Sequence, residues 1–327
     1  MRSKENLKRP IHDESDLGNL LVKTFFGDEP NRSPDKRFVY YTDAETAVKI
    51  IENKEVWLRN ALVMNDYTEI GYGLEGIRNA LFAEGDASGV FAAVEGIVGS
   101  IRERLESELR GTDLFWRITT YLACLSRHKD KEDTTGRLSM WRAYGGVAFV
   151  INGAPFIAQS SGQGAPFSEP VLYLDRSGFA PRLSGVARKL RDYAPDLKAN
   201  REINLESMVN AFARLAYSVA IRAKHPGFSE EKEWRVVFRP PPTPHPHMVP
   251  RRVAINGVAQ TVWALKLVND PANGLAGADL PSLLERIIIG PTAQPLISRD
   301  AFVQLLRAAE VPDANEKVVM SDIPLRA

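Results

Sequence analysis

FSEEKEWRVVF, residues 228–238, opens with charged side chains and closes on β-branched and aromatic ones, which predicts a buried strand with a polar start. Because side chains alternate along a strand, Glu231, Glu233 and Arg235 are expected on one face and Trp234 on the other. Two carboxylates and a guanidinium in line predict an acidic rim held by a cation. A solvated strand start with a structural ion pair explains the same pattern, and charge runs are more often of that kind.

Further strands are predicted on both sides of this stretch, with helices interspersed between them. Asp43 is a favourable N-cap for a helix over residues 44–53, and residues 182–224 have a helical pattern of apolar side chains. The order lacks the regular alternation of a doubly wound sheet, so an α+β fold is expected. The predicted strands cover residues 37–41, 56–58, 121–126, 147–151, 171–174, 234–238, 262–268, 286–290 and 318–320.

The same survey predicts a polar N-terminal extension over residues 1–36, with one apolar patch at 17–26, followed by a single α+β domain over residues 37–327. Neither the Gly-, Ser- and Pro-rich stretch 152–170 nor RPPPTPHPHMVP, residues 239–250, has enough strands beside it to close a separate core. The second stretch is expected to be a stiff, polyproline-like excursion outside the sheet.

Composition limits the classes of partner. The 327 residues include 42 Lys and Arg and 41 Asp and Glu, a net charge of +1, so the whole chain has no field that attracts nucleic acid or anionic membranes, although a local basic patch remains open. The single cysteine, Cys124, forms no internal disulfide and suits a reducing compartment. The polar N-terminus and the lack of an apolar run of about 18 residues predict a soluble, cytoplasmic protein without a membrane partner.

Two further motifs carry candidate functional residues. SMWRAYGG, residues 139–146, places Trp141, Arg142 and Tyr144 before a double glycine, which suits either a stacking platform or core packing on a helical turn. YYT, residues 40–42, ends a predicted strand, and NDYTE, residues 65–69, follows soon after; such polar residues bind ligands or make turns.

The sequence contains no motif of several common enzyme classes. P-loop, Rossmann, zincin and α/β-hydrolase signatures do not occur. His245 and His247 alternate with prolines without a third ligand, and no metal is expected. RHKDKEDTTGR, residues 127–137, is expected to be a charged loop.

Six groups of residues together resemble a known family. In chain order they are FVYYT with WL (38–42 and 57–58), MNDYTE (64–69), LS leading to MWRAYG (125–126 and 140–145), Lys224 before EKEWR (231–235), IIIGP (287–291) and SDIPLR (321–326). This series resembles the bacterial family catalogued as domain of unknown function family 2971, over about residues 37–326. The family often has Pro after the Asn-Asp pair, where this chain has Tyr67.

The arrangement of these motifs is similar to that of ADP-ribosyltransferase-like folds, which implies a mixed, mostly antiparallel split sheet with flanking helices. Carried over residue by residue, the resemblance gives the first NAD contact to Tyr41 and Thr42. It gives the middle position to Ser126 or Tyr144, and the Glu-x-Glu position to Glu231 and Glu233.

The resemblance also implies a mechanism with NAD as substrate and no metal. Glu233 would stabilise the oxocarbenium-like ribose, an electrostatic contact worth on the order of 3 kcal/mol or about a hundredfold in rate. Glu231 would orient or deprotonate the acceptor, Trp141 and Tyr144 would stack nicotinamide, and Arg142 or Lys224 would hold a phosphate. The acceptor, whether protein, nucleic acid or small molecule, is left open, as is a role as toxin, effector or defence component.

Two alternatives compete with this transferase hypothesis. A non-catalytic scaffold of the same fold would use the motifs for packing and bind a partner, for which an inhibitor or effector protein is a natural choice. A Mg²⁺-dependent nuclease would use Asp196 with Glu230 and Lys232, a superficial PD…ExK pattern that requires the Asp on a strand.

Overall fold

The computed structural model describes residues 10–27, 36–64, 69–157, 165–243 and 245–323. Contacts between Cα atoms divide the chain into two compact units. Unit 1 comprises Met1–Glu29, Thr68–Trp116 and Leu172–Pro226, and unit 2 comprises Pro30–Tyr67, Arg117–Val171 and Gly227–Ala327. The expectation of a single domain over residues 37–327 stays a prediction.

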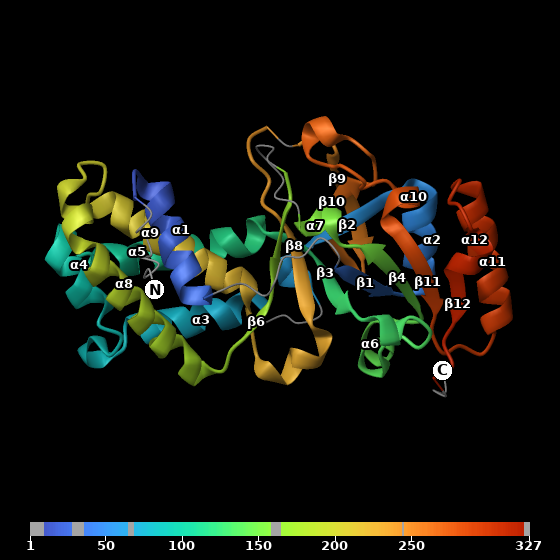
Figure 1. Ribbon diagram of the computed structural model, residues 1–327, viewed down its shortest axis with the longest axis horizontal. Coiled ribbons are helices and arrows are strands. Elements are labelled where there is room, and N and C mark those ends of the chain that lie inside the picture. The colour runs from blue at the N-terminus through green and yellow to red at the C-terminus, as the bar shows by residue number, and fades with distance from the viewer. Residues whose placement is uncertain (1–9, 28–35, 65–68, 158–164, 244, 324–327) are drawn as a thin grey trace, which may run out of the picture. The chain divides into compact units, whose positions relative to one another are not determined.

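Unit 2 is built on one sheet, and the α+β fold is confirmed. Within the described residues the sheet has ten strands in the order β12-β11-β4-β1-β3-β2-β10-β9, with β8 and β5 branching from β3 (Figure 1). Apart from the parallel β11–β12 pair, the described strands of this sheet pair antiparallel, so it is mixed and mostly antiparallel as expected. Its strands are β1 Arg37–Thr42, β2 Glu55–Asn60, β3 Tyr121–His128, β4 Val147–Asn152, β5 Phe167–Pro170, β8 Glu233–Phe238, β9 Met248–Ile255, β10 Val258–Lys266, β11 Leu284–Ile289 and β12 Val318–Met320.

The sheet splits at β3. Along one edge, β3 pairs with β1 through Ser126 and with β2 through Leu122, while β8 occupies the opposite edge. The strands β12-β11-β4-β1 and the strands β2-β10-β9 therefore leave β3 as two separate groups. This arrangement brings the start of β1 and the end of β3 next to the start of β8, where the candidate site lies.

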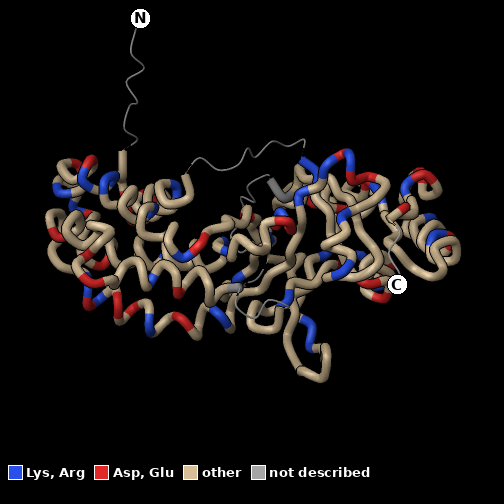
Figure 2. Tube along the Cα trace, turned by 90° about the horizontal axis from the view of Figure 1, so that it is seen from below, with Lys and Arg blue, Asp and Glu red and all other residues tan. Residues whose placement is uncertain are grey.

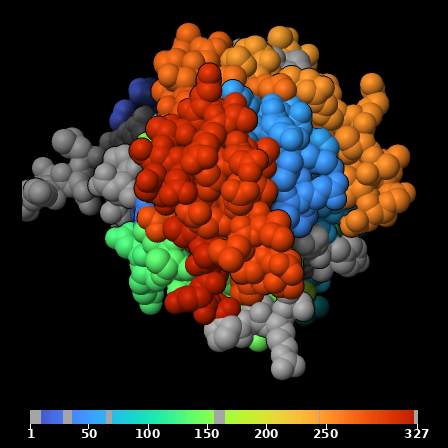
Figure 3. Space-filling model, turned by 90° about the vertical axis from the view of Figure 1, so that its right-hand side faces the viewer, coloured from blue at the N-terminus to red at the C-terminus, as the bar shows by residue number. Residues whose placement is uncertain are grey.

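One face of the sheet carries the main hydrophobic core of unit 2. Phe38, Leu125 and Trp234 point to this face, which is the alternation that the strand sequences predict. The helices α2 (Ala44–Asn53), α10 (Leu280–Leu283), α11 (Pro295–Ala308) and α12 (Ala314–Lys317) contribute to the same core. Figure 3 shows α2 side by side with the C-terminal helices. Asp43 caps α2 as predicted, since its Oδ1 accepts from the Thr46 backbone N–H at 2.7 Å.

The other face of the sheet has a smaller apolar cluster and more polar side chains. Helix α6 (Leu138–Tyr144) packs Met140 and Trp141 against Val39 and Tyr41 of β1 there. Because Val39 pairs with Ser126 and Ser126 pairs with Glu233, the polar residues of β3 and β8 also point to this face. The candidate functional site is on this face.

Unit 1 is helical. Its helices are α1 (Glu14–Phe26), α3 (Glu69–Leu81), α4 (Val90–Val98), α5 (Arg102–Thr119), α8 (Phe179–Ala199) and α9 (Leu205–Arg222), and α5 belongs to this unit as far as Trp116. The short strands β6 (Leu172–Tyr173) and β7 (Ala223–Lys224) form a parallel pair. Part of the expected N-terminal extension is thus structured, since α1 buries Leu17 and Leu21 and packs on α8 and α9. The helical pattern over residues 182–224 is two helices, because the turn before the N-cap Asn204 interrupts it.

One sequence-based expectation needs correction. The end of the proline-rich stretch lies in the sheet, since Met248, Val249 and Pro250 begin β9, and Pro250 pairs with Trp263 of β10. β9 is an edge strand, where a missing N–H costs no ladder hydrogen bond. In the described residues no helix is long and apolar enough to cross a membrane.

Candidate functional site

The start of β8 differs from the predicted alternation at Glu231. This residue ends the 3-10 helix η5 (Pro226–Glu231), and Lys232 has a left-handed backbone with φ 47° before β8 begins at Glu233. The expectation that Glu231 shares a strand face with Glu233 is therefore wrong. The turn at Lys232 is held by two backbone hydrogen bonds, from Lys232 N–H to the Ser229 carbonyl at 3.3 Å and from Arg127 N–H to the Lys232 carbonyl at 3.0 Å.

Glu233 and Arg235 form a buried ion pair. Arg235 Nε donates to Glu233 Oε1 at 2.7 Å, and the two side chains are 0% and 3% exposed, respectively. The predicted cation partner is confirmed, but the predicted rim is not, because the Glu233 carboxylate lies inside the protein. A buried pair of this kind is costly to break, since one charge would be left without a partner.

The partly exposed carboxylate of the site belongs to Glu231. The Tyr144 hydroxyl donates to Glu231 Oε1 at 3.2 Å. Tyr144 closes α6, whose Trp141 packs edge-on against Tyr41 with ring centroids 4.8 Å apart. Burial raises the pKa of Tyr41 to about 12 against an opposing effect of Arg137, so the phenol is neutral at physiological pH.

Ser126 and Arg137 hold this carboxylate segment in place. The Ser126 hydroxyl donates to the Glu231 carbonyl and accepts from Arg137 Nη1 at 2.6 Å. Arg137 also donates to the carbonyls of Glu230 at 3.0 Å, Glu231 at 3.2 Å and Arg127 at 3.0 Å. One guanidinium thus ties the end of β3 to the turn before β8.

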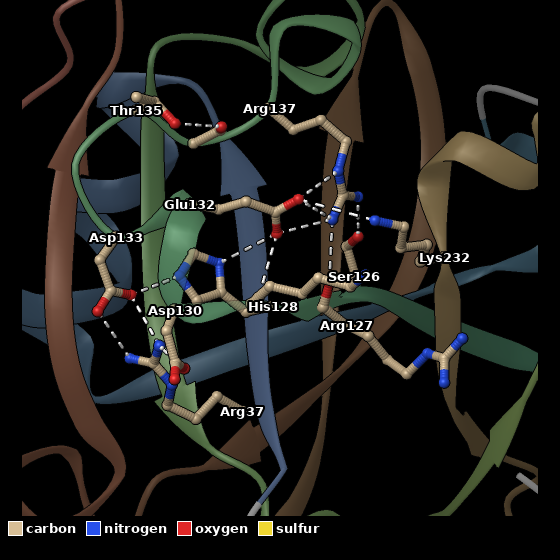
Figure 4. A network of polar contacts seen from close by, with 12 residues as sticks. Arg37, Ser126, Arg127, His128, Asp130, Glu132, Asp133, Thr135, Arg137 and Lys232 are labelled. Carbon is tan, nitrogen blue, oxygen red and sulfur yellow. Dashed lines mark hydrogen bonds and ion pairs between the residues drawn. The ribbon is translucent and has the colours of Figure 1, made fainter.

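A chain of polar contacts continues behind Arg137 (Figure 4). Glu132 receives hydrogen bonds from Arg137, with Nη2 to Oε2 at 3.0 Å, and lies 3.7 Å from Lys232 Nζ. Buried His128 lies between Glu132, at 3.9 Å, and Asp133, to which its Nε2 is bonded at 2.8 Å. Arg37 of β1 completes the network by binding Asp133 at 2.9 Å, with Asp130 and Glu285 as further partners.

Charges in this network stabilise one another. Burial raises the pKa of Glu132, but hydrogen bonds and charge from Arg137 outweigh it and hold the pKa below its ordinary value. The pKa of Asp133 is lowered in the same way, because hydrogen bonds from Arg37 and His128 exceed the effect of burial. Burial is the main cause of the lowered pKa of His128, which favours the neutral imidazole.

The remaining predicted site residues have different settings. Thr42 is buried at the end of β1, and Arg142 is exposed on α6. Lys224 is buried on β7, in unit 1. NDYT, residues 65–68, lies outside the described residues. Of the predicted set, the structure therefore brings together Tyr41, Ser126, Trp141, Tyr144, Glu231 and Glu233 within unit 2.

The histidines of the proline-rich region form hydrogen bonds within unit 2. His247 Nε2 pairs with Asp270 Oδ2 at 2.8 Å, and His245 Nε2 is 2.8 Å from the Asn273 carbonyl. The bond from His247 is the main cause that lowers the pKa of Asp270 to about 2. Across the part of the chain that the structure describes, no group of three or more His, Cys, Asp or Glu side chains is placed to hold a metal ion.

Comparison with known proteins identifies one segment. Residues 140–236 match the family model "Protein of unknown function (DUF2971)". No curated protein and no solved structure matches this chain. The resemblance predicted from the motifs is thus confirmed over these residues, while the similarity to ADP-ribosyltransferases stays a prediction.

The DUF2971 segment contains Trp141, Tyr144, Glu231 and Glu233, whereas Ser126 and Arg137, which bond the Glu231 backbone, precede its first residue. Arg37, His128, Glu132, Asp133 and Arg137 were not among the predicted site residues. The sequence has one indication of these residues, the alternation of acids and bases in the charged loop after β3. In the structure this loop contains the turn η3 (Asp130–Glu132), in which Glu132 accepts a hydrogen bond from Lys129 N–H at 3.1 Å. What the sequence does not show is that this loop folds back on β1 and β8.

Proposed function

We propose that this chain is an NAD-dependent ADP-ribosyltransferase acting at the surface of unit 2 around Glu231. The observation that supports this most is the hydrogen bond of 3.2 Å between the Tyr144 hydroxyl and a partly exposed Glu231 carboxylate, with the aromatic pair Tyr41–Trp141 behind it. A carboxylate beside an aromatic side chain suits a ribose next to a flat, positively charged nicotinamide ring.

The reaction would be a substitution at C1′ of the ribose. The bond from C1′ to the nicotinamide nitrogen breaks, and its electron pair leaves with nicotinamide, which becomes neutral. A lone pair of the acceptor forms the new bond to C1′, and the acceptor's proton passes to a carboxylate or to water. The C1′ centre is oxocarbenium-like in between, so a carboxylate near the 2′-hydroxyl lowers the barrier by on the order of 3 kcal/mol.

The geometry favours Glu231 over Glu233 for the contact with the reacting ribose. Glu233 is paired with Arg235 and almost wholly buried, whereas the Glu231 side chain is partly exposed. In this proposal Glu233 orders the start of β8 through Arg235, and Glu231 stabilises charge at the ribose. The direct role of Glu233 stays a prediction, and comparison of the single variants Glu231→Gln and Glu233→Gln in nicotinamide release separates the two roles.

The other predicted residues receive roles by their exposure. Tyr144 is partly exposed and stacks nicotinamide, while Trp141, whose Nε1 donates to the Thr135 carbonyl at 2.9 Å, supports it from the core. Arg142 is exposed and suits a phosphate. Tyr41 and Thr42 line the end of β1, and a role for Lys224 is the least supported because it is on unit 1. The role as toxin, effector or defence component rests on the motif resemblance alone.

Nicotinamide release from NAD tests the proposal, with cell lysate supplied as acceptor. Wild type is expected to release nicotinamide and to add ADP-ribose mass to a lysate component. Glu231→Gln removes the charge but keeps the shape, and a loss of about a hundredfold is expected. Glu230→Gln is the matched control, because Glu230 is exposed and its carbonyl, not its side chain, bonds Arg137. Equal rates in wild type and Glu231→Gln would contradict the assignment.

A partner-binding scaffold is the second candidate, favoured by one observation. The guanidinium of Arg137 donates hydrogen bonds to Glu132, Ser126 and three backbone carbonyls, so it has protein partners without a ligand. A scaffold predicts neither NAD affinity in calorimetry nor nicotinamide release. The nuclease pattern receives no support, since Asp196 lies in α8 of unit 1 rather than on a strand.

A further inference from the structure

A cavity lies in the main core of unit 2, between the sheet and the helices α2 and α10. Its lining includes Ala123 and Leu125 of β3 on the side of the sheet, and Ile50 of α2 and Leu280 of α10 on the side of the helices. These side chains belong to the core face of the sheet, whereas the site around Glu231 and Tyr144 is on the other face. The cavity is therefore separate from the candidate site.

The split of the sheet at β3 accounts for this space. β1 pairs with β3 as far as Val39, which lies opposite Ser126. β2 pairs with β3 only from Arg59 onward, which lies opposite Leu122. Among the described strands, none pairs with residues 123–125 on this edge of β3, because β1 and β2 diverge there. Both β3 residues that line the cavity fall in this gap, so the topology of the sheet itself leaves the space.

The cavity is small and apolar. Its volume is about 50 Å³, whereas one water molecule needs about 10–15 Å³ of such space. Among the residues that line it, all of them described, Tyr40 alone has a polar side-chain group. A buried water needs about two to four polar partners, so these walls favour a dry cavity. Since a cavity of about 150 Å³ holds benzene, this one has room for about two carbon atoms.

The mouth of the cavity lies between β1 and β2 where the two strands diverge. Tyr40 of β1 and Val56 of β2 are half-buried, while the other lining residues are buried. Burial raises the pKa of Tyr40 to about 12, so its phenol is neutral at physiological pH. A neutral phenol both donates and accepts, so beside its hydrogen bond with Thr42 it has capacity for a further one.

Charges of both signs act at this mouth. After burial, the charges of Cys124 and Asp43 raise the pKa of Tyr40, and the charge of Arg59 lowers it. Basic and acidic residues are also interspersed along the trace (Figure 2), and the net charge of the chain is +1. Neither the mouth nor its surroundings therefore selects an ion. A charge would also lose its hydration in the apolar interior, which favours a neutral ligand.

We propose that this cavity binds a small neutral molecule with a short aliphatic end. About two carbon atoms of the ligand lie against Ala123 and Leu125, and the hydrogen-bonding group next to them meets the Tyr40 hydroxyl at the mouth. Apolar walls with few polar groups that orient the ligand are typical of small-molecule sites. The cavity does not depend on the proposed transferase activity, since it and Glu231 lie on opposite faces of the sheet.

Methyl NMR of the full chain, titrated with n-propanol, glycerol or propionate, tests the site. The probes have equal numbers of carbon atoms but differ in polarity and charge. n-Propanol should shift the methyl signals of Ala123, Leu125 and Ile151 until they saturate, because these residues line the cavity. Glycerol and propionate should bind at least about tenfold more weakly, since extra hydroxyls or a charge are costly to bury among apolar side chains.

Substitutions that fill the cavity should remove the site. Ala123→Val should weaken n-propanol binding at least about tenfold, and Val56→Ile at the mouth, a smaller change, at least about threefold. Val56→Ile carries the test if Ala123→Val does not fold. Ala259→Val is the matched control, because it makes the same change at an exposed position of β10 and should bind like wild type. Tyr40→Phe keeps the ring and should weaken binding about two- to tenfold through the lost hydrogen bond.

Several results would overturn the proposal. These are a wild type whose signals n-propanol does not shift to saturation, glycerol or propionate that binds as tightly as n-propanol, or filled variants that bind like wild type. Unchanged binding by Tyr40→Phe would overturn the contact assigned to the hydroxyl. Nicotinamide release tests the proposed function alone, so its presence or absence leaves the outcome of these titrations unaffected.

Discussion

Replacing Arg137 with Ala should destabilise unit 2 strongly. In the native protein this guanidinium bonds Glu132, Ser126 and the backbone carbonyls of Arg127, Glu230 and Glu231. The substitution removes all of these donors at once, and it leaves a carboxylate that is 10% exposed without its main partner.

The expected cost is about 3 kcal/mol. Removing one partner of a buried ion pair costs about 3–5 kcal/mol, because the other charge stays buried. Glu132 keeps Lys129 N–H at 3.1 Å and Lys232 Nζ at 3.7 Å, which places the value at the lower end. Changing Glu132 to Gln in the same chain removes the orphaned charge, so the double variant should be more stable than Arg137→Ala alone.

The loss should depend on pH. Arg137 lowers the pKa of Glu132 below its ordinary value, and a carboxyl with a lowered native pKa stabilises the fold above its unfolded pKa of about 4.3. That contribution disappears as pH falls through the native pKa. Without Arg137, the burial that raises the pKa of Glu132 is opposed only by Lys129 N–H and the charge of Lys232, so we expect the pKa of Glu132 to rise and the variant to lose less stability on acidification than wild type. The difference in free energy of unfolding between wild type and Arg137→Ala should therefore narrow from pH 7 toward about pH 4.

Urea unfolding at several pH values measures this gap. Tryptophan fluorescence is a suitable signal, because Trp141 and Trp234 lie in unit 2. Arg142→Ala, an exposed change in the same helix, is the control and should cost less than about 0.5 kcal/mol. An Arg137→Ala variant as stable as this control, or a gap that widens on acidification, would refute the reasoning.

Two further substitutions test neighbouring features. Gly136 has φ 65°, and a Cβ there would lie 2.3 Å from Trp141 Cζ2, so Gly136→Ala should lower the free energy of unfolding by about 2 kcal/mol or more in thermal unfolding. The control Gly146→Ala, whose Cβ would have nothing within 4 Å, should be nearly neutral, and equal effects of the two substitutions would show that the packing under Trp141 is loose. Arg37→Met should raise the pKa of Asp133, so the loss in free energy of unfolding relative to wild type should be largest at neutral pH and vanish as pH falls below the native pKa of Asp133. A loss that persists at low pH in urea unfolding would contradict this ion pair as the cause.

Elements with strong local signals were predictable from the sequence. The strand β1, the Asp43 cap of α2 and the buried strand β8 all follow from short-range patterns. The hairpin of β9 and β10 also has a signal in the sequence, the pair Asn256-Gly257, and in the structure both residues have the positive φ, 52° and 78°, that a two-residue turn requires. The prolines before this turn argue against a strand, which is why residues 239–250 are expected outside the sheet.

The assembled site was predictable only in part. Tyr144 and Glu231 were both candidates, but their contact spans 87 positions of the chain, and that between Arg37 and Glu285 spans 248. No periodicity shows which strand edges meet. The left-handed turn at Lys232 likewise depends on partners from β3, and it moves Glu231 off the face that strand alternation assigns to it.

The most direct test of the account is nicotinamide release from NAD by wild type with cell lysate as acceptor, compared with Glu231→Gln under the same conditions. The account predicts release by wild type and a loss of about a hundredfold in the variant, with both proteins folded. No release by wild type, together with no NAD affinity in calorimetry, would contradict the transferase assignment and favour the scaffold.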